Sequence, residues 1–144
     1  MFRVMIVDDE PMAIKRFESL LNKTGKVSLA AAYTDPEDAL RHCRHVHVDI
    51  AFVDIEMPGM NGLLLAEKLQ EIDPMLEIIM VTAHDQYALE AFRAHAVGYL
   101  LKPVSLEEVD RLLDRMEKHR GRQESGAERQ LQIQVFKQFQ CFTD

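Results

Sequence analysis

The sequence of 144 residues has no tryptophan and two cysteines, and no apolar run approaches the ~18 residues that a membrane-spanning helix requires. Cys43 and Cys141 form neither a CxxC pair nor a four-ligand zinc pattern, so they cannot staple a small fold. Lys and Arg total 17 against 24 Asp and Glu, and the net charge of −7 makes the bulk of the chain a poor binder of nucleic acid. One short apolar stretch precedes Asp8 and Asp9, which is not the pattern of a secretory signal. We expect a cytoplasmic protein without a membrane segment.

The sequence also lacks a glycine-rich phosphate loop of the GxxxxGK or GxGxxG type, which argues against a nucleotide-binding protein. It contains a repeated alternation of short apolar runs and amphipathic stretches. The apolar runs predict strands at 2–7, 27–33, 50–53, 76–81 and 97–101. The helical periodicity predicts helices from Pro11 onward and at 36–45, 63–71, 84–94 and 105–120. Five such units imply parallel strands joined by right-handed crossovers, in an α/β fold whose sheet is covered on both faces.

The composition changes after residue 120. Residues 121–130 are polar and mixed in charge, which is typical of a linker. From residue 131 the sequence LQIQV alternates strictly, as a half-buried strand does, and β-forming residues continue to 142. Because a single strand is not stable alone, we interpret 131–144 either as a strand added to a neighbouring sheet or as the start of a second domain.

Polar side chains that can bind a metal ion or take part in a reaction follow four of the predicted strands. Asp8 and Asp9 follow the first, Asp54 the third, Thr82 the fourth and Lys102 the fifth. These ends meet at one edge of a parallel sheet, where ligands of such folds bind. Grouped carboxylates need a compensating cation, and their hard oxygens suit Mg²⁺, which commonly also binds a phosphate oxygen. We therefore expect a Mg²⁺ site, an aspartyl phosphate, and a lysine and a hydroxyl that contact the phosphoryl oxygens.

Four motifs, in order and suitably spaced, carry a resemblance to a known family: VDDE at 7–10, VDIEMPGMNG at 53–62, VTA at 81–83 and VGYLLKP at 97–103. With them, the segment from Phe2 to Arg120 resembles the receiver domain of bacterial two-component response regulators. The resemblance implies a flavodoxin-like (βα)5 fold, a doubly wound parallel sheet with strand order 2-1-3-4-5. It also implies that 1–120 forms the receiver domain.

The resemblance gives the acidic residues their roles. Asp54 would be the phosphoacceptor. Asp9, directly or with Asp8 through water, would hold Mg²⁺ together with Asp54 and the backbone carbonyl of Glu56. Glu56 and His84 flank the site, at positions that in the family tune how water reaches the phosphoryl group; both can equally be ordinary surface side chains.

The resemblance also gives roles to the last two strand ends. Thr82 and Lys102 would bind the phosphoryl oxygens, and the bond between Lys102 and Pro103 would be a cis peptide. Tyr99 would be the aromatic switch that turns inward as Thr82 follows the phosphoryl group, and its alternative role is packing in the core.

The implied function is transfer of a phosphoryl group from the phosphohistidine of a sensor histidine kinase to Asp54, in a regulatory phosphoacceptor rather than an enzyme. The moving face would comprise the fourth helix, the fifth strand and the fifth helix. We expect this face to mediate phosphorylation-dependent homodimerisation through Tyr87, Ala91, Arg93, Val97, Glu107, Arg111 and Arg115.

The tail and two internal stretches bear on the output. LQIQVFKQFQCF resembles the opening strand of the winged-helix domain in SARP-type transcriptional activators, and DQYALEAF with VGYLLKP resembles regulators with a LytTR-type DNA-binding domain. Both indicate transcription control, with DNA bound only through an output domain that this chain lacks. The alternatives are a stand-alone receiver that signals through a protein partner, an aspartyl-phosphate phosphatase with Glu56 as general acid, and a receiver-like module that is never phosphorylated.

Overall fold

The structure is a computed structural model, and it describes residues 1–120. Five strands alternate with five helices in this range: β1 (Phe2–Val7), α1 (Pro11–Thr24), β2 (Val27–Tyr33), α2 (Pro36–His45), β3 (Ile50–Val53), α3 (Gly62–Ile72), β4 (Glu77–Thr82), α4 (Ala88–Arg93), β5 (Gly98–Leu101) and α5 (Leu106–Arg120). The predicted linker at 121–130 and the predicted strand or domain start at 131–144 lie outside the described residues. No described helix is long and apolar enough to cross a membrane.

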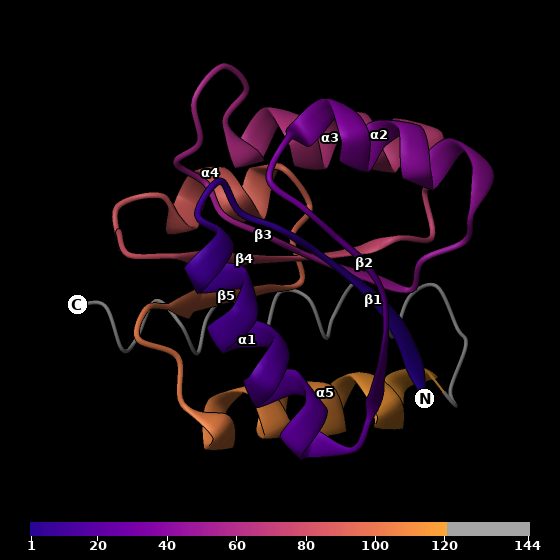
Figure 1. Cartoon of the computed structure of the whole chain (residues 1–144), viewed down its shortest axis with the longest axis vertical. Helices are drawn as coiled ribbons and strands as arrows, with labels where there is room; N and C mark the ends of the chain where they lie inside the picture. Colours follow the sequence, from indigo (N-terminus) through magenta and orange to yellow (C-terminus); the bar gives the residue numbers. More distant parts are fainter. Residues whose placement is uncertain (121–144) are drawn as a thin grey trace.

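The five strands form one parallel sheet in the order β2-β1-β3-β4-β5, which confirms the predicted fold. Figure 1 shows α1 and α5 together on one face of this sheet and α2 and α3 on the other. The pairing of β1 with β2 is irregular between Val4 and Met5, and the other strand pairs keep a regular register. All five strands therefore end at the same edge of the sheet.

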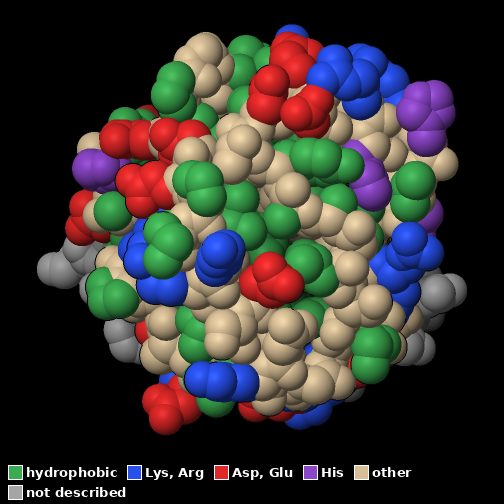
Figure 2. Space-filling view, viewed as in Figure 1, with side chains coloured by type: hydrophobic (Ala, Val, Ile, Leu, Met, Phe, Trp, Pro, Cys, Tyr) green, Lys and Arg blue, Asp and Glu red, His purple; other side chains and the backbone are tan. Residues whose placement is uncertain are grey.

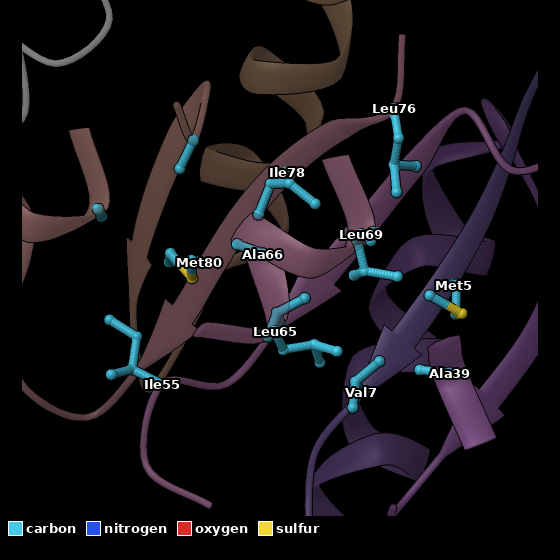
Figure 3. Packing of buried hydrophobic residues seen from close by; sticks show 14 of the residues in the cluster. Met5, Val7, Ala39, Ile55, Leu65, Ala66, Leu69, Leu76, Ile78 and Met80 are labelled. Carbon is cyan, nitrogen blue, oxygen red and sulfur yellow. The ribbon is translucent and has the colours of Figure 1, made fainter. Parts of the chain in front are cut away.

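The sheet separates two apolar cores because successive side chains of a strand point to opposite faces. In β1, Met5 and Val7 pack against α2 and α3, as Figure 3 shows, whereas Val4 and Ile6 pack against α1 and α5. The same alternation continues in β3 and β4, whose residues are nearly all buried. This two-sided burial explains why these strands are almost unbroken apolar runs in the sequence.

Side chains cap three helices at their N-termini. Asp35 accepts from the N–H of Glu37 over 2.9 Å, immediately before Pro36. Ser105 accepts from the N–H of Glu108 over 3.2 Å and donates to the Glu108 side chain over 3.0 Å, which makes a capping box of the sequence Ser-x-x-Glu. In α3 the cap is Asn61, whose side chain accepts from the N–H of Leu64.

The fourth helix is shorter than predicted. It covers Ala88–Arg93 rather than 84–94, because residues 84–87 form a turn before it. The N–H of His84 donates back to Thr82 Oγ instead of joining a helix. Local periodicity does not detect such a contact.

The expected dimerisation face needs a correction. Ala91 is fully buried and Val97 is only 6% exposed, so both pack in the core and the prediction that they meet a partner is wrong. The rest of that set lies on the surface or at its margin: Tyr87 is half-buried, and the exposed residues are Arg93, Glu107, Arg111 and Arg115.

Candidate functional site

The polar residues at the carboxyl ends of the strands converge as predicted. Oxygen atoms of Asp8, Asp9 and Asp54 all lie within 4.8 Å of one another, and within residues 1–120 no other group of three or more His, Cys, Asp or Glu side chains is as close. Figure 2 shows Asp and Glu side chains gathered at the upper left of the molecule, where the end of β1 and α4 lie in Figure 1. The arrangement is an acidic site at one edge of the sheet.

Backbone hydrogen bonds extend the ladders of the sheet into this site. The N–H of Asp54 donates to the carbonyl of Val7 over 2.9 Å, and the N–H of Lys102 donates to the carbonyl of Thr82 over 2.8 Å. The N–H of Asp8 donates to the carbonyl at the end of β2 over 3.1 Å. These residues follow their strands directly, so the sheet itself fixes where their side chains start.

Lys102 supplies the positive charge of the site. Its Nζ lies 2.7 Å from Asp8 Oδ2 and 3.4 Å from Asp54 Oδ2. Burial alone would lower the pKa of Lys102, but the hydrogen bond that Lys102 donates to Asp8 and the charges of both carboxylates outweigh it and raise that pKa. Lys102 is thus held as a cation between the two aspartates.

The negative charge of the Asp54 carboxylate is only partly compensated by the groups around it. Burial raises the pKa of its carboxyl, and the charge of Asp8 adds to this effect. The charge of Lys102 and the N–H of Glu56, which donates to Asp54 Oδ1 over 3.3 Å, lower the pKa without cancelling the rise. Three clustered carboxylates with one lysine are a setting that favours a further cation.

The donor atoms fit Mg²⁺. The three clustered ligands are all carboxylate oxygens, the hard donors that this ion prefers, and Asp8, Asp9 and Asp54 come from two loops that the sheet holds in place. The N–H of Glu56 donates to the Asp54 side chain, so Glu56 lies next to the cluster. The role of its carbonyl as a ligand stays a prediction.

The two residues predicted to form the switch, Thr82 and Tyr99, are both buried. Thr82 is fully buried, and Tyr99 is 1% exposed with its ring in the core on the α2 and α3 side. The Tyr99 hydroxyl donates to the backbone carbonyl of His84. The bond between Lys102 and Pro103 is cis, as the resemblance implied.

Two residues that matter for this geometry were not identified from the sequence. A Cβ on Gly62 would lie 2.1 Å from the carbonyl oxygen of Asp54, so only glycine lets the start of α3 approach the Asp54 backbone. Tyr87, assigned from the sequence to a dimer face, donates its hydroxyl to Glu56 Oε1 over 3.0 Å. The helix-start position of Gly62, directly after the cap Asn61, was the available signal for the first; spacing gave none for the second.

A cleft of about 640 Å³ runs beside α1 and opens onto the acidic site. Asp54 and Lys102 line one part of it, and apolar side chains such as Phe17 and Val104 line another. Arg16 and Lys23 of α1 also line it, and neither forms a salt bridge within the described part of the chain. The cleft gives an outside group access to Asp54.

Similarity to known protein families and proteins agrees with this geometry. The family model for the response regulator receiver domain matches residues 4–114. A positive alginate biosynthesis regulatory protein of Pseudomonas aeruginosa is 43% identical over 107 residues, which are 74% of this chain and 43% of that protein. The transcriptional regulatory protein BtsR of Salmonella typhimurium is 33% identical over 126 residues, 86% of this chain and 52% of that protein. The chain thus spans about half the length of these curated relatives.

A solved structure supports the same conclusion. The response regulatory domain of protein mrkE from Klebsiella pneumoniae superposes with a TM-score of 0.77 at 30% identity. The match covers 84% of this chain and 99% of that one.

Proposed function

Because the chain belongs to the response regulator receiver domain family, whose members accept phosphoryl groups in two-component signalling, we propose that Asp54 is its phosphoacceptor. The observation that supports this assignment is the position of the Asp54 carboxylate, next to Lys102 and within 4.8 Å of the Asp8 and Asp9 oxygens. A nucleophilic carboxylate needs compensation of the charges on the incoming phosphoryl group, and this cluster supplies the groups for it.

In the proposed reaction a carboxylate oxygen of Asp54 forms a bond to phosphorus, and the bond from phosphorus to the imidazole nitrogen of a phosphohistidine breaks. Lys102, already held as a cation, binds a phosphoryl oxygen, and Thr82 donates its hydroxyl to another. Asp9, directly or with Asp8 through water, would hold Mg²⁺ together with Asp54 and the carbonyl of Glu56, and the bound ion would supply positive charge against the transferred oxygens.

A sensor histidine kinase is the proposed donor. The cleft beside α1 leads to Asp54 and combines apolar lining with the cations of Arg16 and Lys23. A helix that carries a phosphohistidine can lay its apolar side there while its negative charge approaches Lys102. The cleft is therefore the surface at which we expect the kinase to dock.

The proposed output is a change in self-association that controls transcription. The relatives at 43% and 33% identity are named as regulatory and transcriptional regulatory proteins, and this chain spans about half of each. Exposed residues of the α4–β5–α5 face, with charges of both signs at Arg93, Glu107 and Arg111, suit a symmetric contact between two copies. DNA would be bound through an output domain of SARP or LytTR type, and a stand-alone receiver is the alternative.

The decisive experiment is incubation with acetyl phosphate and Mg²⁺ followed by intact-protein mass measurement. We expect a single phosphoryl increment on the unaltered chain, and none after chelation of the metal or in Asp54→Asn. Asp49→Asn is the matched control, because Asp49 stands at the other end of β3 and should label normally. An unlabelled chain would indicate a module that is never phosphorylated, and steady turnover of small phosphoesters would indicate a phosphatase.

The dimerisation proposal has its own test. Sedimentation velocity with and without beryllofluoride and Mg²⁺ should show a shift from monomer to dimer on addition of the phosphoryl mimic. Reversing charge at Arg111, which is exposed on α5, should weaken that shift. An unchanged mass at all protein concentrations would contradict a phosphorylation-dependent dimer and favour signalling through another protein.

A further inference from the structure

The turn that joins β4 to α4, residues 84–87, is contacted on its outer side by Glu56, a residue of another loop. Glu56 Oε2 lies 2.9 Å from His84 Nε2, and the Tyr87 hydroxyl donates to Glu56 Oε1 over 3.0 Å. The rings of His84 and Tyr87 meet edge to face, with centroids 6.3 Å apart. Glu56, His84 and Tyr87 are here called the clasp, because they connect the loop after β3 to the turn before α4.

The same turn holds Tyr99 on its inner side. The Tyr99 hydroxyl donates to the carbonyl of His84. Burial raises the pKa of Tyr99 to about 12, so the phenol stays protonated and can donate at every ordinary pH. The inward position of the Tyr99 ring therefore depends on where this turn lies.

Two backbone contacts connect the clasp with the acidic site. The N–H of Glu56 donates to Asp54 Oδ1, and the N–H of His84 donates to Thr82 Oγ, each over 3.3 Å. The Glu56–His84 contact closes this chain of contacts, so it links the phosphoacceptor to Thr82 along the outside of the site. Any displacement of the turn changes the surroundings of Thr82 and of Tyr99 together.

We propose that the clasp holds the turn in the arrangement that keeps Tyr99 inward, with Tyr87 and His84 acting as positioning residues through the Glu56 carboxylate. All of these contacts are present with Asp54 unmodified. The clasp therefore sets the share of molecules whose switch already lies inward. The consequence for signalling rests on the proposed function, whereas the structural claim does not.

The expected size of the effect is modest because the clasp is partly exposed. The side chains of His84 and Glu56 are 42% and 48% exposed. Removal of the Tyr87 hydroxyl should shift the inward-to-outward equilibrium of Tyr99 by about two- to tenfold, the range that one net hydrogen bond covers. Loss of the Glu56 carboxylate removes both outer contacts and should shift it further.

The composition of the chain allows a direct measurement. It has three tyrosines and no tryptophan, so 3-fluorotyrosine labelling gives three fluorine NMR signals, which Tyr→Phe variants assign. We expect the Tyr99 signal of the unaltered chain to report a mainly buried ring. In Tyr87→Phe and in Glu56→Ala it should move toward a solvent-exposed position. Tyr33→Phe is the matched control, because Tyr33 ends β2, the outer strand opposite β5, where its hydroxyl hydrogen-bonds with His42 Nδ1, and loss of that contact should leave Tyr99 unchanged.

A double variant separates positioning from general loosening. If Tyr87 acts through Glu56, Tyr87→Phe should have no further effect in the Glu56→Ala background. Additive shifts, an unmoved Tyr99 signal in both single variants, or an equal shift in Tyr33→Phe would each overturn the proposal. Thermal unfolding of every variant checks that it is folded, and Glu56→Leu, which also lacks an acceptor, replaces Glu56→Ala if that variant is not.

The same samples keep this inference apart from the proposed function. Beryllofluoride and Mg²⁺ should move the remaining outward population of Tyr99 inward in the clasp variants. Their failure to act on any sample, with the clasp effects present, would contradict the phosphoacceptor proposal and leave the clasp in place.

Discussion

Asp49 and Asp54 stand at the two ends of one strand, β3, yet the fold gives them opposite electrostatic surroundings. Asp49 lies just before the strand, where it accepts from the N–H of Arg3 over 2.8 Å and lies 2.9 Å from His47 Nε2 and 3.1 Å from an Arg120 nitrogen. Burial alone would raise the pKa of Asp49, but the N–H of Arg3, His47 and Arg120 outweigh it and lower that pKa.

Asp54, just after the strand, shows the reverse. Burial and the neighbouring charge of Asp8 raise its pKa, and Lys102 with the N–H of Glu56 offsets only part of that rise. The chain itself supplies Asp49 with enough hydrogen-bond donors and positive charge, so this carboxylate stabilises the fold. Asp54 is buried with too few of them, which favours the binding of a cation and a functional role for its carboxylate.

The largest effect is expected from replacing Lys102, which lies at the edge of the sheet where the strands end. Lys102→Ala should slow labelling by acetyl phosphate and Mg²⁺ about 100-fold, because it removes a charge that stabilises the transferred oxygens. A time course of intact mass measures this rate. Lys26→Ala is the control: Lys26 precedes β2 at the opposite edge and binds Asp110 and Asp114, each at 2.6 Å. Equal rates in the two variants would remove the claimed difference between the edges.

Gly62→Ala tests how closely the site is built against α3. The added methyl would lie 2.1 Å from the Asp54 carbonyl oxygen, so the loop or the helix must move. We expect a loss of about 3 kcal/mol in the free energy of unfolding, as for overpacked cores, with slower labelling as well. Denaturant unfolding gives the first value.

Gly25→Ala is the comparison for that variant. Gly25 has φ +67 and nothing within 4 Å of an added Cβ, so its substitution carries only the backbone cost of about 1 kcal/mol. If the two alanine variants lost the same stability, the close approach at Gly62 would not be what matters there.

Asp49→Asn should weaken the fold without affecting labelling. Loss of its charged hydrogen bonds to Arg3, His47 and Arg120 should cost about 2 kcal/mol at pH 7. The folded pKa of Asp49 lies below its ordinary 3.8, so this stabilisation is complete above that value and is lost as pH falls through the folded pKa. Urea unfolding of both proteins at pH 7 and near pH 3 should show the difference shrinking.

Asp54→Asn gives the contrasting measurement. Without added metal it removes one charge from a cluster of three carboxylates that has a single lysine, so stability at pH 7 should be unchanged or higher. A loss as large as that of Asp49→Asn would mean that both acids serve the fold alike.

The sequence predicted the part of the site that topology determines. Asp8, Asp54, Thr82 and Lys102 each end a strand or follow one directly, and parallel pairing is sufficient to bring such residues to one edge. The division of the β1 side chains between the two cores and the caps at Asp35 and Ser105 are likewise local consequences of sequence. The roles of these residues in phosphoryl transfer remain proposals.

The sequence did not predict what depends on contacts between loops. The length of α4 is limited by the His84 N–H, which binds Thr82, and by Glu56, which holds the turn from a loop 28 residues earlier. The burial of Ala91 and Val97 depends on which face of a short helix meets the sheet, and six helical residues give too little periodicity to show it. Such features appear only when the elements pack.

The smallest effect is expected at His95, in the connection from α4 to β5. This connection lies at the edge of the sheet where the strands begin, here called the amino edge. His95 has φ 65, a left-handed conformation that costs a residue with a Cβ about 1 kcal/mol, and its side chain is exposed. His95→Gly should therefore raise the free energy of unfolding by about 1 kcal/mol with no change in labelling, whereas His95→Ala should keep the strained backbone and the original stability. The backbone carbonyl of His95, which accepts from Gln70, is preserved in both variants. A stabilised amino edge with unaltered chemistry would show that the fold can be tightened there independently of Asp54, whereas a drop in labelling would mean that the two edges are coupled through β5.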